Sequence, residues 1–215
     1  MTNPIVWYVD EDETQSKTYV NELRMLLQSS LDVQAIYPPF RTKEEYLPIL
    51  KNPKTACLVF DQRLKDTGMA TYSGIELATY IRSVNSKIPI YILTNYARDD
   101  EEKEEFSDKS WSVEQIIDKG SLNRDEYAQE ISSRILRHIN VYEDILGERE
   151  AKFRSLLQKS VVSGLTENEQ AEFDKLQFER SQVTLASELP EKQELDELVK
   201  INSQLLDLLQ QKKDE

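Results

Sequence analysis

The stretch that decides the fold is ACLVFD at residues 56–61, in which five apolar residues are followed at once by an acid. A short unbroken apolar run of this kind is typical of a strand buried on both faces of a parallel sheet. A second run, IVWYV at residues 5–9, ends in the same way at Asp10 and Glu11. Because the carboxyl ends of parallel strands lie at one edge of a sheet, these two runs predict an acidic cluster there.

Strand and helix patterns alternate along the rest of the first 140 residues. Further strands are predicted over 33–37, 88–93 and 113–117. Helices are predicted around 19–27, over 42–50, 73–84 and 97–107, and from Leu122 onward. Five strands alternating with five helices predict an α/β fold, namely a doubly wound five-stranded parallel sheet with helices on both faces.

After about residue 140 only helical patterns continue. The apolar stripe of the fifth helix runs to Leu157 without a proline, so this helix is expected to extend well beyond the sheet. Gly164 is a candidate terminator, a capping-box pattern at 166–169 begins a second tail helix reaching about residue 186, and Pro190 suits the first turn of a third. We therefore expect a domain over 1–139 and an all-helical extension over 140–215, arranged as a hairpin, a bundle or part of a coiled coil.

Composition restricts the classes of function. The 215 residues include 40 acidic and 27 basic ones, for a net charge of −13, which argues against a nonspecific nucleic-acid binder. The single cysteine, Cys57, and the single histidine, His138, exclude an intramolecular disulfide and a Cys/His zinc cluster, and both are interpreted as structural. No apolar run is long enough to cross a bilayer and no secretory signal opens the sequence, so we expect a cytoplasmic protein without a membrane partner.

Polar groups follow the predicted strands and are expected to converge at one edge of the sheet. They are Asp10, Glu11, Asp61, Thr94 and Lys119. Carboxylates that share a pocket repel one another, and Mg²⁺ relieves that repulsion because it prefers oxygen ligands. A carboxylate with a lysine beside it and a metal in front of it can attack a phosphoryl group and form an acyl phosphate, whose new oxygens a threonine hydroxyl can contact.

Residues 4–139 resemble the receiver domain of two-component response regulators. The matching segments, in order, are VWYVDEDE (6–13), CLVFDQRL (57–64), SGIELATYIR (73–82), PIYILTNYA (89–97) and IIDKG (116–120). No single segment is specific, whereas five in the right order and roughly the right spacing are. The resemblance implies the flavodoxin-like receiver fold.

The resemblance also implies roles for particular residues. Asp61 would be the phosphoacceptor, Thr94 the switch hydroxyl and Lys119 the cation that contacts the phosphoryl group. Mg²⁺ would be held by Asp10, Glu11, Asp61 and the backbone carbonyl of Arg63. In this family the phosphoryl group comes from a phosphohistidine on a partner kinase.

Several positions depart from the common pattern of the family. Glu11 stands where Asp is commoner, Asn95 where a small residue is usual, Gly120 where a proline is usual, and Ile116 where many members carry a Tyr or Phe that reports phosphorylation. The loop between Asp61 and Gly74 is longer than is common. Arg63 and Tyr96 occupy two positions that influence water access to the acyl phosphate in the family, and their size predicts slow autodephosphorylation.

We predict a receiver that signals through protein contacts of its helical tail rather than by binding DNA. Its expected partners are a histidine kinase or phosphotransfer protein and an effector protein, and a homodimer through the fifth helix and tail is preferred. No glycine-rich phosphate loop or Ser/His/Asp set indicates a catalytic output domain, so the chain is not expected to be an enzyme. Two alternatives stay open: a constitutive receiver-like adaptor or scaffold that is not phosphorylated, and a phosphotransfer or phosphatase enzyme that uses Asp61 on an external substrate.

Overall fold

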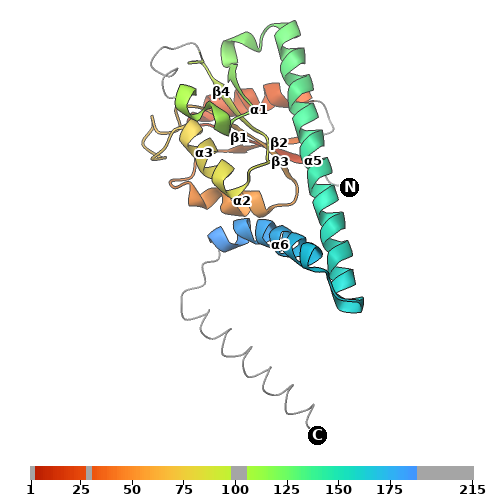
Figure 1. The fold of residues 1–215 in the computed structure, drawn as a ribbon. Helices are drawn as coiled ribbons and strands as arrows, with labels where there is room; N and C mark the ends of the chain where they lie inside the picture. The colour runs from red at the N-terminus through yellow and green to blue at the C-terminus, as the bar shows by residue number, and fades with distance from the viewer. Residues whose placement is uncertain (1–2, 28–30, 98–105, 188–215) are drawn as a thin grey trace.

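The five strands form one parallel sheet, in the order β2-β1-β3-β4-β5. Figure 1 shows this sheet with α3 to one side of it and α5 to the other. The structure is a computed structural model and describes residues 3–27, 31–97 and 106–187. Its elements are β1 (Ile5–Val9), α1 (Glu13–Leu27), β2 (Asp32–Ile36), η1 (Glu44–Tyr46), α2 (Leu47–Lys51), β3 (Thr55–Phe60), α3 (Gly74–Val84), β4 (Ile90–Thr94), η2 (Ser110–Ser112), β5 (Gln115–Asp118), η3 (Lys119–Ser121), α5 (Asp125–Val162) and α6 (Glu167–Ser187). The predicted fold class, a doubly wound five-stranded parallel sheet with helices on both faces followed by a helical region, is confirmed.

Helices cover both faces of the sheet. On one face, α1 and α5 pack against the sheet through Val20, Leu23, Ile131 and Ile135. On the other face, α2 and α3 pack through Leu47, Leu50, Ile75 and Ile81. The central strand β3 is buried along all six of its residues, which explains why its sequence is continuously apolar rather than alternating.

The observed element ends differ from the predicted ones by a few residues. Strand β4 begins at Ile90 and includes Thr94, and β5 begins at Gln115 rather than at residue 113. The predicted helix over 42–50 is a 3₁₀ turn followed by the short helix α2, with Pro48 in the first turn of α2, where proline is tolerated. The predicted helix over 97–107 lies mostly on residues outside the described ranges.

Helix α5 continues without a break from the sheet into the tail. It spans 38 residues, which corresponds to about 57 Å at the usual rise of an α-helix. It ends at Val162, and Gly164, two residues further on, has a φ of +78°, the left-handed conformation that favours glycine just after a helix. The capping box predicted for the next helix is present, because the backbone N–H of Thr166 donates to Glu169 and that of Glu169 donates to the Thr166 hydroxyl.

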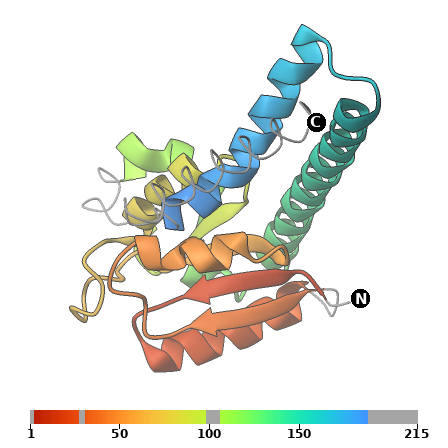
Figure 2. The ribbon, with the colours of Figure 1, turned by 90° about the horizontal axis from the view of Figure 1, so that it is seen from below.

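After the turn at Gly164 the chain reverses direction, and helix α6 packs against the sheet domain. It contacts α5, α2 and α3, and Figure 2 shows its later turns next to α2 and α3. The rings of Phe153 and Phe173 stack between α5 and α6, with centroids 5.2 Å apart. The third predicted tail helix lies outside the described residues. Among the helices that are described, none is long and apolar enough to span a membrane.

Candidate functional site

The residues that follow β1 and β3 lie side by side at the carboxyl edge of the sheet. Val9 pairs with Phe60 in the parallel register, so Asp10 and Asp61 come next at the same level. The backbone N–H of Asp61 donates to the Val9 carbonyl at 2.8 Å and extends this pairing. Lys119 follows β5, which is two strands from β3 and three strands from β1, and its long side chain reaches back across the edge to both acids.

Lys119 joins the two acids through a buried ammonium group. Its Nζ donates to Asp61 Oδ1 at 2.7 Å, to Asp10 Oδ2 at 3.1 Å and to Gln15 Oε1 at 3.1 Å, and the residue is 2% exposed. Burial lowers the pKa of Lys119, but the carboxylates of Asp61 and Asp10 outweigh burial and raise it above its ordinary value. The lysine is therefore charged at neutral pH and is a counter-ion for both acids.

Asp10 is fixed in orientation by donors on both of its oxygens. The Tyr8 hydroxyl donates to Oδ2 at 2.5 Å, and the backbone N–H of Asp12 donates to Oδ1 at 2.9 Å. Burial, followed by the charge of Asp10, raises the pKa of Tyr8 well above its ordinary value, so the hydroxyl keeps the proton that it donates.

Asp61 is held from its side chain and from its backbone. Its Oδ2 accepts the backbone N–H of Arg63 at 2.6 Å. Burial raises the pKa of Asp61, and the Lys119 ammonium opposes that rise. A Cβ atom at Gly74 would lie 2.2 Å from the Asp61 carbonyl oxygen, so the start of α3 can approach this turn only with glycine at that position.

Glu11 is the third predicted carboxylate of the site. Its Oε2 atom is buried and has no hydrogen-bond partner. Burial, and next the charge of Asp61, raise the pKa of Glu11 to about 7. A cation beside this atom would therefore meet a carboxylate oxygen that makes no hydrogen bond in the described pocket.

Thr94 is fully buried at the end of β4, and its hydroxyl oxygen accepts the backbone N–H of Tyr96 at 3.2 Å. The guanidinium of Arg63 lies over the Tyr96 ring, with Cζ 3.4 Å from the ring centroid. This cation–π contact joins the loop that follows Asp61 to the loop that follows Thr94.

The predicted donors fit Mg²⁺ by their chemistry, since carboxylate and carbonyl oxygens are its preferred protein ligands. Across the three described ranges, however, no group of three or more Asp, Glu, His or Cys side chains is placed to hold a metal ion. In the described pocket the Lys119 ammonium contacts both Asp10 and Asp61. The Oε2 atom of Glu11 is the predicted metal ligand that has no hydrogen bond to give up. The Arg63 carbonyl as a ligand stays a prediction.

Three polar or aromatic residues around Lys119 were missed by the sequence reasoning. Gln15 accepts a bond from the lysine, Tyr8 donates to Asp10, and the Tyr19 ring centroid lies 4.6 Å from Nζ. The position of Gln15 could have been noticed in the sequence, because it lies in the first turn of α1, which begins two residues after Glu11. The sequence contained no comparable sign that the hydroxyl of Tyr8, on a buried strand, would turn back to Asp10.

Similarity to known proteins is found among solved structures. No protein-family model matches the sequence, and no curated protein matches it. The chain is similar to the response regulator TrrA of Thermotoga maritima, solved with Mg²⁺ and BeF, at 20% identity over 60% of this chain and 97% of that chain, with a TM-score of 0.44. It is also similar to receiver domain proteins of Clostridium thermocellum and Methanospirillum hungatei, each at 17% identity over 66% of this chain and 98% of that chain, with TM-scores of 0.47 and 0.45.

Proposed function

We propose that this chain is a response-regulator receiver that accepts a phosphoryl group on Asp61 and signals through its helical tail. The observation that carries the proposal is the buried ammonium of Lys119, which contacts Asp61 and Asp10 together. A buried lysine that bridges two strand-end carboxylates has no need to be there for packing, and desolvating three charges is costly. These three charged side chains are accounted for if the pocket has to bind a further negative charge.

The proposed reaction is a phosphoryl transfer from a phosphohistidine of a histidine kinase or phosphotransfer protein. An oxygen of the Asp61 carboxylate attacks phosphorus, the P–N bond to the imidazole breaks, and the imidazole leaves with the bonding electron pair and takes up a proton. Asp10, Glu11, Asp61 and the Arg63 carbonyl would hold Mg²⁺, which supplies positive charge for the phosphoryl oxygens. Lys119 would supply a second positive charge, and Thr94 would contact the new oxygens.

Intact mass spectrometry after incubation with acetyl phosphate and Mg²⁺ tests the transfer. We expect one added phosphoryl group on the unsubstituted chain and none on Asp61→Asn, which keeps the volume of the side chain and removes the nucleophile. Omitting Mg²⁺ should reduce the yield. Equal labelling of the two proteins, or no labelling of either, would remove the chemical basis of the proposal.

Slow autodephosphorylation is the second expectation for this site. The Arg63–Tyr96 contact lies between the loops that follow Asp61 and Thr94, and two large side chains there restrict the approach of water. We predict that replacing both residues with alanine shortens the half-life of the acyl phosphate by about tenfold, roughly 1.4 kcal/mol in the barrier to hydrolysis. The measurement is the decay of the phosphorylated mass with time. A half-life in the unsubstituted chain as short as in the double variant would contradict the prediction.

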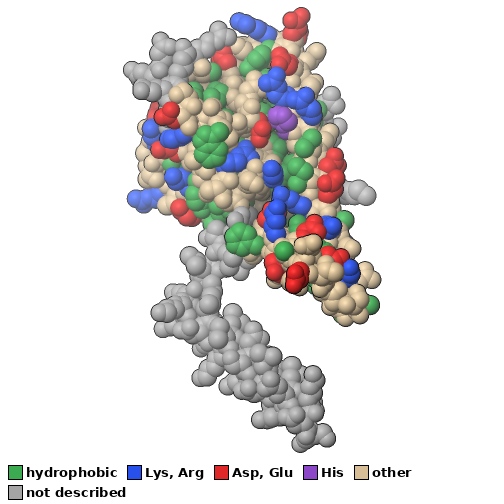
Figure 3. Space-filling model, viewed as in Figure 1, with side chains coloured by type: hydrophobic (Ala, Val, Ile, Leu, Met, Phe, Trp, Pro, Cys, Tyr) green, Lys and Arg blue, Asp and Glu red, His purple; other side chains and the backbone are tan. Residues whose placement is uncertain are grey.

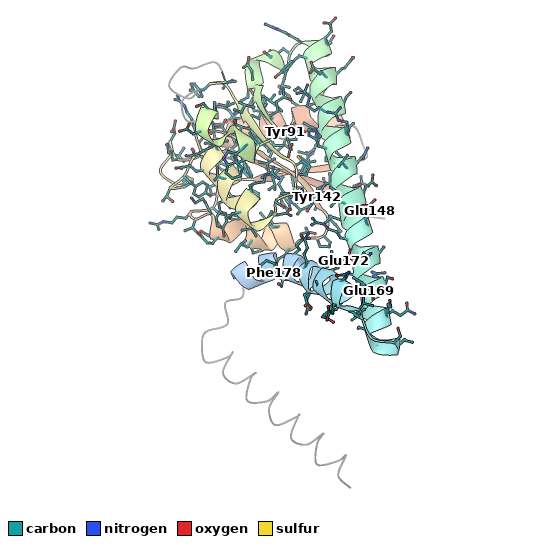
Figure 4. All side chains as sticks on the ribbon, in the orientation of Figure 1. Tyr91, Tyr142, Glu148, Glu169, Glu172 and Phe178 are labelled. Atoms are coloured by element: carbon teal, nitrogen blue, oxygen red, sulfur yellow. The ribbon has the colours of Figure 1, made fainter. Side chains whose placement is uncertain are left out.

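Output through the tail is supported by the way α5 and α6 are attached to the sheet domain. Asn85, at the end of α3, donates to the hydroxyl of the buried Tyr142 on α5 at 3.0 Å. A groove of about 1150 Å³ lies between these helices and the ends of α2 and α3, and the side chains of Tyr142 and Phe178 line it (Figure 4). We propose an effector protein as the partner of this surface. On the face drawn in Figure 3, acidic and basic side chains are interspersed, which does not favour a nucleic-acid partner.

A constitutive adaptor is the second candidate. Ile116 favours it, because this half-buried aliphatic residue packs into the core and has no ring whose rotation could report phosphorylation. A Mg²⁺ titration followed by tryptophan fluorescence separates the candidates, since Trp7 lies on the strand that leads to Asp10. A response that is lost in Asp10→Asn favours the receiver, whereas no response favours the adaptor.

A further inference from the structure

All three N–H groups of the Lys119 ammonium have acceptors in the structure. Two acceptors are the carboxylates of Asp10 and Asp61. The third is the neutral amide oxygen of Gln15, 3.1 Å away, and the Tyr19 ring closes over the same ammonium one turn further along α1. An ammonium has three donors, so this buried group has none left for a further acceptor.

An incoming phosphoryl group therefore requires an exchange of bonds. If Lys119 contacts a phosphoryl oxygen, one of its three present acceptors must be released. The bonds to the two carboxylates join opposite charges, and such hydrogen bonds are stronger than those to a neutral amide. While both carboxylates are intact, the bond to Gln15 is consequently the one that is released at the lowest cost in free energy.

We propose that Gln15 is a positioning residue that holds the third N–H of Lys119 in the resting pocket and yields it to the phosphoryl group. This inference rests on the proposed function and adds to it the residue that sets how readily the pocket accepts the anion. Gln15 stabilises the resting arrangement only, because its bond is lost when the anion binds. The side chain therefore lowers the affinity of the pocket for a phosphoryl-like anion.

Beryllofluoride binding at saturating Mg²⁺ tests the inference, with the affinity measured by calorimetry on the full chain. Gln15→Met keeps a similar length and removes the acceptor, so one buried N–H is unpaired in the resting state and paired in the bound state. We expect it to bind beryllofluoride about tenfold more tightly than the unsubstituted chain. Gln15→Glu supplies a charged acceptor and should bind about tenfold more weakly. Thr14→Met and Thr14→Glu, at the exposed neighbouring position on α1, control for side-chain bulk and for added charge.

We expect the beryllofluoride affinity to rise in one Gln15 variant and to fall in the other. A general disturbance of the pocket would instead lower the affinity in both. If Gln15→Met binds no more tightly than the unsubstituted chain, the inference is wrong and the proposed function stands. If Gln15→Met does not fold, Gln15→Glu decides, and an affinity equal to that of Thr14→Glu overturns the inference. If the unsubstituted chain shows no Mg²⁺-dependent binding of beryllofluoride, both the inference and the proposed function are wrong.

Discussion

Single side chains set the charge balance of the pocket at the carboxyl edge of the sheet. Asp10 and Asp61 are almost fully buried, and Lys119 is the cation that contacts both. Removing one partner from a buried ion cluster is far more destabilising than removing an exposed pair, because the remaining charges lose their compensation without regaining water. The free energy of unfolding is therefore a measure of the charge balance in this pocket.

We predict that Lys119→Met lowers the free energy of unfolding by about 3 kcal/mol in the presence of a chelator, because two buried carboxylates then face each other. Added Mg²⁺ should restore part of this loss by supplying the missing positive charge. Urea unfolding with and without Mg²⁺ is the measurement. Lys17→Met, which removes an exposed lysine paired with Glu13, is the control and should change little. A loss that is the same with and without Mg²⁺ would count against an electrostatic role for Lys119.

The raised pKa of Glu11 predicts a pH dependence of metal binding. With a pKa of about 7, the carboxyl is mostly protonated at pH 6 and mostly ionised at pH 8. Since a protonated carboxyl is a poor metal ligand, the Mg²⁺ affinity should fall about tenfold from pH 8 to pH 6. Glu11→Gln should bind Mg²⁺ more weakly and with little change over this range. Calorimetric titration at both pH values checks this, and a flat profile in the unsubstituted chain would show that Glu11 is not a ligand.

At the scale of single elements, the first turn of α3 is hydrogen-bonded to the turn that contains Asp61. Ser73 and Glu76 form a capping box, and the backbone N–H of Gly74 donates to the Gln62 carbonyl beside Asp61. Helix α3 is thereby joined to the turn that presents Asp61. Displacement of the first turn of α3 would move the carboxylate as well.

Gly74→Ala and Gly147→Ala form a matched pair of helix substitutions. At Gly74 the new Cβ would collide with the Asp61 carbonyl, so we predict a loss of stability of at least about 2 kcal/mol and weaker beryllofluoride binding. At Gly147, within α5, nothing lies within 4 Å of the new Cβ, so alanine should stabilise the protein by about 0.5–1 kcal/mol through helix propensity alone. Thermal unfolding of both variants measures the difference. Similar effects of the two substitutions would be inconsistent with the close approach at Gly74.

At the scale of the whole molecule, α5 belongs both to the sheet domain and to the tail. Its first half packs on the sheet through Ile131, Ile135 and Ile139, and its second half pairs with α6 through the Phe153–Phe173 stack. The partly buried pair Arg149–Glu179 and the exposed pair Lys152–Glu172 also join the two helices, although ion pairs in contact with solvent add little stability. A shift of α5 against the sheet would thus be transmitted to α6 and to the groove beside it.

We predict that beryllofluoride with Mg²⁺ changes amide hydrogen exchange in α5 and α6 as well as around the pocket. The reason is the continuous helix and its contact with α3 through Asn85 and Tyr142. Hydrogen exchange with mass detection measures it, and Tyr142→Phe, which removes the bond to Asn85, should reduce the change in α6. Exchange differences confined to the residues around Asp61 would show that the tail does not respond.

The sequence by itself determined the order of strands and helices, the acids that end β1 and β3, and the turn at Gly164. These features depend on local periodicity, on burial on both faces of β3 and on capping by residues three apart, all of which can be recognised along the chain. Only the tertiary structure decided the return of α6 onto α2 and α3, the approach of Gly74 to Asp61, and the bond from Lys119 to Gln15, which lies 104 positions away. Contacts of this kind depend on how elements pack and on which rotamers their side chains adopt, and neither leaves a periodic pattern in the sequence.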